Sequence, residues 1–153
     1  MPERERGLRQ PAIFKDIISD LEDSDRRNFE RACEEFHRIL EGILDVKAKH
    51  NSDGLRETET LRIKSKRAAY DFWIAEEATD VGEAKNIVVK ARPVSEFVVA
   101  DYIVLRAGVD GIIHNVLGEH DFSEDNYGEV KVYTDMLKYM KENLPDPLPR
   151  GRR

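Results

Sequence analysis

The sequence lacks the residues that disulfide-linked, zinc-stabilised and membrane-spanning folds require. Its 153 residues include a single cysteine, Cys33, which excludes an intramolecular disulfide and a cysteine-based zinc site. Charged residues such as Asp101, Arg106 and Asp110 interrupt the longest apolar stretch, so no run reaches the roughly 18 residues of a membrane span. We therefore expect one domain that is held together by packing alone.

Charge of either sign is not in large excess. The chain has 31 acidic and 25 basic residues, which gives a formal net charge of −6. This balance argues against a dedicated duplex-DNA or polybasic membrane binder, because such proteins present a net-basic face. The first ten residues lack the apolar core of a secretory signal. Together with the single cysteine, these features predict a cytoplasmic protein without a membrane partner, and they do not favour nucleic acid.

Composition divides the chain into three parts. Residues 1–10 are predicted to be a flexible N-terminal arm, and residues 145–153, rich in proline and arginine, a loose tail. Residues 11–144 between them are expected to form a single helical-bundle domain. Within residues 11–23 the apolar side chains recur with helical spacing: Ile13, Phe14, Ile17, Ile18 and Leu21.

Two further segments have the period of an amphipathic helix. The first runs from Asp25 to about Lys49, and its apolar residues, spaced at about 100° per residue, share one arc: Phe29, Ala32, Cys33, Phe36, Ile39, Leu40, Ile43, Leu44 and Val46. The second starts near Asn126, where Glu129 completes a capping-box-like pattern. Its apolar face comprises Val130, Tyr133, Met136, Leu137, Met140 and Leu144.

A helix is also predicted from about residue 55 to residue 81, and its apolar residues form two stripes on nearly opposite sides. The stripes are Leu61, Ala68, Phe72 and Ala75, and Ile63, Tyr70, Ile74 and Val81. A helix with two apolar stripes is either sandwiched in its own bundle or lends one stripe to another subunit. Trp73 lies between the stripes and would dominate either contact. We predict an interaction surface at Tyr70, Trp73 and Ile74.

The most apolar stretch, residues 94–117, is predicted to be a central helix that is buried on most sides. Gly108 and Gly111 each cost about 1 kcal/mol relative to alanine there, so a close neighbour or a kink is expected. Asp101 would lie on the apolar side and must be paired or hydrogen-bonded. The predicted fold is therefore all-α, a bundle of about five helices around this central helix.

An α+β fold stays open as an alternative. Ile87, Val88 and Val89 are β-branched, which favours a strand. In that interpretation residues 86–105 form a hairpin that turns near Pro93.

Acidic and histidine residues at helical spacings suggest a divalent-metal site. Glu34 and His37 form a Glu-x-x-His pair, which lets a carboxylate and an imidazole reach one metal from a bundle interior. The predicted central helix adds Asp110 and His114. Ferritin-like di-metal bundles use two Glu-x-x-His pairs, and the spacing of Asp110 and His114 departs from that pattern. A solvated acidic edge with an ordinary surface histidine is the alternative.

Arg31 and His37 are separated by five residues. This spacing is similar to the Arg-x(4–6)-His pattern of HEPN ribonuclease domains, which are all-helical and dimeric, and the similarity covers this one spot. It implies an RNA-processing domain in which the arginine binds the scissile phosphate and the histidine transfers a proton. On a helix the two side chains point about 120° apart, which does not favour a shared site.

The function predicted from these features is a non-catalytic, intracellular helical module for protein–protein interaction or assembly. The second apolar stripe beside Trp73 favours self-association as a homodimer or another homo-oligomer. A carboxylate and histidine metal site is the first alternative, and the HEPN-like RNA-processing domain is the second. The sequence leaves open whether the protein is an enzyme, although it contains no motif specific enough to name a reaction.

Overall fold

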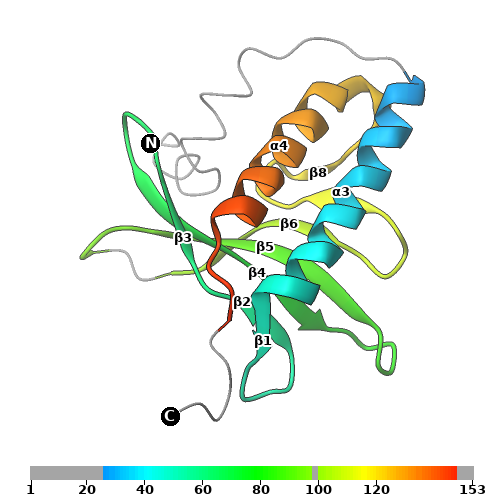
Figure 1. The fold of residues 1–153 in the computed structure, drawn as a ribbon. Coiled ribbons are helices and arrows are strands. Elements are labelled where there is room, and N and C mark those ends of the chain that lie inside the picture. Colours follow the sequence, from blue (N-terminus) through cyan, green and yellow to red (C-terminus); the bar gives the residue numbers. More distant parts are fainter. Residues whose placement is uncertain (1–25, 98–99, 148–153) are drawn as a thin grey trace.

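The computed structural model describes residues 26–97 and 100–147, and its fold is α+β rather than the predicted all-α bundle (Figure 1). In this part of the chain, one antiparallel sheet is combined with two long helices, α3 (Arg26–Lys47) and α4 (Tyr127–Asn143), and a short 3₁₀ helix, η1 (Glu124–Asn126). The predicted arm, the predicted helix over residues 11–23 and the end of the predicted tail lie outside the described residues. No described helix is long and apolar enough to cross a membrane.

The sheet follows the chain almost in order. Its strands are β1 (Ala48–His50), β2 (Arg56–Thr58), β3 (Leu61–Lys64), β4 (Ala69–Ala78), β5 (Lys85–Pro93), β6 (Tyr102–Ala107), β7 (Ile113–Asn115) and β8 (His120–Asp121). Hydrogen-bonded neighbours are ordered β1-β2-β4-β5-β6-β7-β8, and β3 also pairs with β4. The longest pairing joins β4 to β5, from Tyr70 opposite Pro93 to Ala78 opposite Lys85.

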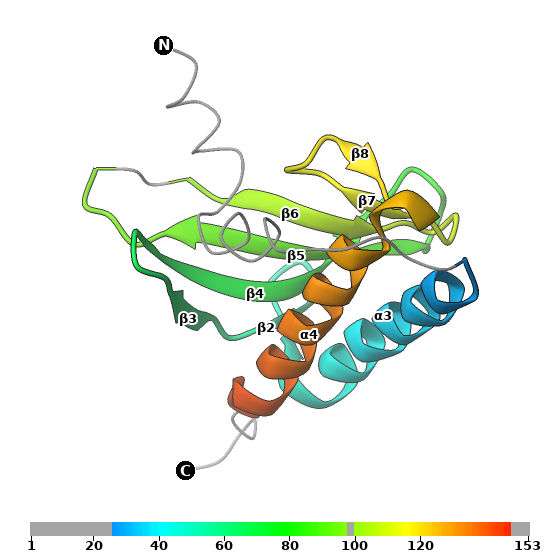
Figure 2. The same ribbon diagram turned by 90° about the horizontal axis from the view of Figure 1, so that it is seen from above.

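Both long helices cover the same face of the sheet (Figures 1 and 2). They run in the same direction: Arg26 Nε lies 3.5 Å from Glu124 Oε2 at one end, and Lys47 Nζ lies 2.6 Å from Asp146 Oδ1 at the other. The core between helices and sheet includes Phe36, Ile43, Leu137 and Met140 from the helices and Phe72, Ile74, Val89 and Leu105 from the strands. The apolar faces predicted for the two helices are therefore confirmed in their central turns.

The opposite face of the sheet has a small apolar centre under a layer of charged side chains. Trp73, Ala75 and Val88 form this second cluster. The Trp73 Nε1–H donates to Glu57 Oε2 at 3.0 Å, and the Arg92 guanidinium lies 5.0 Å from the centre of the indole ring. Charged groups thus shield the second apolar face of β4 from water.

The prediction of a helix over residues 55–81 is wrong, because this segment forms β2, β3 and β4. Side chains of β4 point alternately to the two faces, and both faces are buried at its centre, so four consecutive positions, Phe72 to Ala75, are apolar. On a helical wheel the same residues form two opposite stripes. Tyr70, Trp73 and Ile74 are only 8%, 4% and 0% exposed, so they provide no spare apolar surface, and the argument for self-association from them no longer applies.

The prediction of a central helix over residues 94–117 is also wrong. This stretch contains β6 and β7, and β6 pairs with β5 in an antiparallel hairpin, as in the α+β alternative, although the connection is longer than the predicted turn. Gly111 lies in the turn between β6 and β7 with a φ of +84°, a conformation that suits glycine. Asp101 was predicted on an apolar side, whereas it is exposed and its carboxylate pairs with Arg92 at 2.7 Å on the surface.

Replacement of Ile74 by glutamate distinguishes the observed sheet from the predicted helix, in which Ile74 would lie on an exposed apolar stripe. Because Ile74 is fully buried in the core, Ile74→Glu is expected to cost about 4 kcal/mol or more of unfolding free energy. Circular dichroism and urea denaturation should show an unfolded or severely destabilised chain. The matched change Lys64→Glu, at an exposed position of β3, should shift stability by about 0.5 kcal/mol at most. A folded Ile74→Glu protein of normal stability would contradict the structure.

Acid should weaken the fold through Glu77. Two hydrogen bonds from Arg106, at 2.8 and 2.9 Å, lower the pKa of the Glu77 carboxyl below its usual range, against the opposing effect of burial. A carboxyl whose pKa is lowered by folding stabilises the folded state above its unfolded pKa, and this contribution is lost as the pH falls through the folded value. The unfolding free energy of wild type should therefore fall below about pH 4.5, and that of Glu77→Gln should fall less steeply. Identical pH profiles in urea titrations would refute this role.

Candidate functional site

The four predicted metal ligands lie on different elements. Glu34 and His37 are on α3, Asp110 is in the turn between β6 and β7, and His114 is on β7. The fold brings Asp110 and His114 within 3.9 Å of each other. In the described ranges, no group of three or more His, Cys, Asp or Glu side chains is arranged to hold a metal ion, so the four do not form one site there.

His114 is held by carboxylates. Its Nδ1 lies 2.5 Å from Asp121 Oδ1 on β8, and its Nε2 faces Asp110. Both carboxylates are more than half exposed. We infer that this group closes the small β7–β8 hairpin against the preceding turn, because all three side chains belong to adjacent segments of one chain region.

A second polar group connects the same hairpin to α4. Glu129 Oε1 accepts a hydrogen bond from Asn115 Nδ2 at 2.6 Å and lies 3.2 Å from His120 Nε2. Gly118 lies against these side chains, and a Cβ there would come within 2.5 Å of Asn115 Nδ2, so a larger residue would displace the group. Glu129 was predicted to cap its own helix, whereas it fixes the position of the hairpin.

Arg31 and His37 do not face a common site. The exposed Arg31 lines a crevice of about 160 Å³ between α3 and α4, and His37 is not among the residues around it. The His37 ring packs edge-on against Phe36 at 6.4 Å. The fold is also not the all-helical one that the HEPN resemblance implies.

Cys33 borders a cavity of about 410 Å³ that reaches from α3 to the turn before β7 and also touches Glu34 and Phe122. Burial raises the pKa of the Cys33 thiol to about 11. The thiolate is the reactive form of cysteine, so this side chain is a poor nucleophile near neutral pH.

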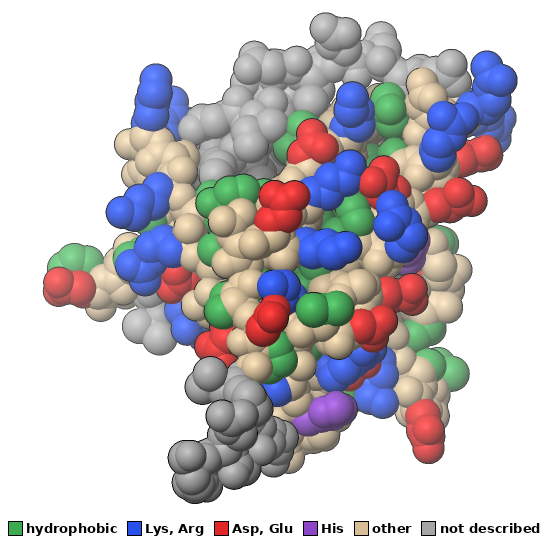
Figure 3. All heavy atoms as spheres, in the orientation of Figure 1, with side chains coloured by type: hydrophobic (Ala, Val, Ile, Leu, Met, Phe, Trp, Pro, Cys, Tyr) green, Lys and Arg blue, Asp and Glu red, His purple; other side chains and the backbone are tan. Residues whose placement is uncertain are grey.

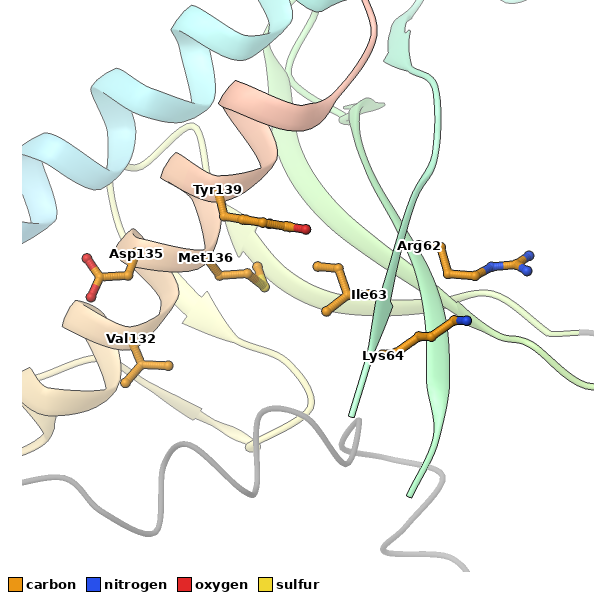
Figure 4. A pocket seen from close by; sticks show the side chains of 7 residues that line it. All are labelled: Arg62, Ile63, Lys64, Val132, Asp135, Met136 and Tyr139. Carbon is orange, nitrogen blue, oxygen red and sulfur yellow. The ribbon is translucent and has the colours of Figure 1, made fainter. Parts of the chain in front are cut away.

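The β3–α4 groove is a larger hollow on the other side of α4, and its volume is about 810 Å³ (Figure 4). Its lining residues are Arg62, Ile63 and Lys64 from β3 and Val132, Asp135, Met136 and Tyr139 from α4. Figure 4 shows Ile63 pointing from the strand toward Met136 and Tyr139, whereas Arg62 and Lys64 point away from the helix. The inner surface of the groove is therefore apolar.

The walls of the groove differ in exposure. Ile63 and Met136 are 9% exposed and form its floor, whereas Tyr139 is 48% exposed on its rim. Val132, Met136 and Tyr139 are spaced i, i+4 and i+7 along α4, so they form a second apolar row beside the core-facing row. This spacing was visible in the sequence, but Val132 and Tyr139 lie outside the predicted face and were not identified.

The hairpin that joins β3 to β4 adds positive charge beside the groove. Arg62 pairs with Asp71 at 2.9 Å. Lys64, Lys66 and Arg67 are exposed, and no ion pair involves them in the part of the chain that the structure describes. Lys and Arg side chains project over this hairpin at the left of the molecule in Figure 3. The groove thus has an apolar floor, and its basic margin lies along the hairpin, on the side of β3 that faces away from α4.

No model of a known protein family matches the chain, and searches of curated proteins and of solved structures found no match either.

Cys33 should react slowly with alkylating reagents. With a pKa of about 11, about 0.1% of the thiol is ionised at pH 8, compared with about a quarter for an unperturbed cysteine. The alkylation rate with iodoacetamide, followed by mass spectrometry, should be about a hundredfold lower than that of a free cysteine peptide and should reach the peptide's rate in denaturant. Equal rates for native protein and peptide at pH 8 would rule out a buried, protonated thiol.

Proposed function

We propose that the protein is a non-catalytic protein-interaction module that binds an amphipathic helix with acidic polar residues in the β3–α4 groove. The observation that carries this proposal is the row Val132, Met136 and Tyr139 opposite Ile63, next to a basic hairpin. Helix-in-groove recognition uses apolar anchors at successive turns of the ligand, and such anchors need an apolar trough with a polar margin.

Size and exposure favour a macromolecular ligand. A volume of about 810 Å³ falls within the range of binding pockets, but sites for small ligands enclose most of their ligand. Here Tyr139 is half exposed on the rim, where it contacts a ligand that lies along α4. Tyrosine is enriched among residues that dominate binding energies, because it contributes a large apolar surface and a hydroxyl group.

The exposed cations of the β3–β4 hairpin should select the charge of the ligand. Lys64, Lys66 and Arg67 are solvated and gain from an acidic partner mainly through long-range attraction, which raises the association rate and weakens with salt. The basic margin therefore favours an acidic helix over a basic one, and the apolar floor provides most of the affinity.

Self-association remains a second prediction, and it now rests on the β3–α4 groove instead of Trp73. If the bound helix belongs to another copy of the chain, the protein forms a dimer through this groove. Light scattering at tens of micromolar measures this directly.

Binding can be measured by fluorescence anisotropy with a labelled, designed helical peptide that has Ile, Phe and Leu on one face and Asp and Glu on the other. The host is the full chain with Phe14→Asp and Ile17→Asp, which interrupts the apolar face predicted for residues 11–23, so that this segment offers no second apolar ligand. We expect micromolar affinity, and at least about a tenfold loss when Tyr139→Asp is added.

The matched control is Lys131→Asp, which places the same carboxylate on α4 at an exposed position outside the groove. Its affinity should stay within about twofold of the host protein, because it removes no apolar contact. An equal loss in both variants, or no loss with Tyr139→Asp, would refute the groove as the binding site.

A further inference from the structure

We infer that the β3–α4 groove is occupied by residues 11–23 of the same chain, so that the module masks its own binding surface. The inference rests on the proposed function, because it names the segment that occupies the groove when no external helix is bound. Three observations carry it: the place where α3 begins, the apolar pattern of residues 11–23, and the charges of the two partners.

The described chain begins close to one end of the groove. Arg26, the first residue of α3, pairs with Glu124 just before α4 starts. Residues 22–25 span up to about 14 Å when extended, which is enough to cross the end of a helix of about 10–12 Å diameter. Val132 follows the start of α4 by five residues, or about 7.5 Å along the axis, so a segment entering there meets the groove directly.

The apolar pattern of the segment matches a trough of this kind. At about 100° per residue, its five large apolar side chains fall within an arc of about 140°, and its charged residues occupy the rest. From Ile13 to Leu21 such a helix covers about 12 Å, comparable to the roughly 10 Å from Val132 to Tyr139. One apolar face is therefore long enough to cover the exposed row of α4.

Charge supports the same pairing. Residues 11–23 contain one basic residue, Lys15, and four acidic residues, Asp16, Asp20, Glu22 and Asp23, for a net charge of 1 − 4 = −3. The basic margin of the groove contains Lys64, Lys66 and Arg67 without ion-pair partners in the described chain. Opposite net charges attract the segment to this side of the molecule and disfavour a basic competitor.

Attachment through a short connection makes the masking effective. A tethered ligand has an effective concentration in the millimolar range, so a segment with micromolar intrinsic affinity keeps the groove filled about 99% of the time or more. An external helix must compete with this segment, and its apparent affinity falls by the same factor of about 100 to 1,000. Displacement of residues 11–23 would then be the step that activates binding.

The test titrates a fluorescein-labelled peptide of residues 11–23 into two full-length proteins, the wild type and the Phe14→Asp, Ile17→Asp double variant. The double variant should bind the peptide with at least about a hundredfold higher affinity than the wild type. Ser19→Asp is the matched control, because it adds a carboxylate on the polar side of the same segment and should behave like wild type. Circular dichroism checks that all three proteins are folded, and Ile17→Ala, a milder change, should give an intermediate affinity.

Each result has one meaning. Equal affinity for wild type and double variant would show an open groove in wild type and overturn the inference, while the proposed function stands. Absence of peptide binding to both proteins, with no binding of the designed helix either, would overturn the proposed function as well. Weak binding to a wild type that is dimeric by light scattering would identify the segment of a second copy as the occupant, which overturns masking within one chain.

Discussion

Burial of β4 on both faces is the constraint on which the rest of the fold depends. Phe72 and Ile74 face the two helices, and Trp73 lies on the opposite face beneath Arg92. A strand covered on both sides cannot slip by one residue, because a slip would exchange its two sets of side chains. The long register with β5 follows from this constraint, and the shorter strands continue the sheet from these two.

The helices that cover the sheet also create the groove. Paired at both ends by ion pairs, α3 and α4 lie side by side over the centre of the sheet and leave β3, at its edge, only partly covered. Ile63 and Met136 line the floor of the resulting hollow, and Tyr139 stays half exposed. An exposed apolar trough of this kind is typical of a surface that binds an apolar partner. The sequence just before α3 contains acidic residues together with apolar residues at helical spacing.

Sequence patterns identified the elements that are buried on one face and exposed to solvent on the other. Helices α3 and α4 were predicted because one face of each is apolar and the other is charged. The strands were missed because burial on two faces removes the alternation that marks a strand, so β4 and β6 have the composition of buried helices. Of the residues that line the groove, Met136 was predicted from the sequence, but as part of the helix's core-facing row. Ile63 reaches the groove only because β3 pairs with β4, and no local sequence pattern predicts that pairing.

Methyl NOE spectroscopy of the wild-type chain tests the central claim most directly. The δ-methyl group of Ile63 and the ε-methyl group of Met136 lie on the floor of the groove, next to any segment that fills it. We predict cross-peaks from both methyl groups to side chains between Ile13 and Leu21, and the same cross-peaks in a dilute, monomeric sample. Cross-peaks confined to β3 and α4, with residues 13–21 giving random-coil shifts, would contradict the account.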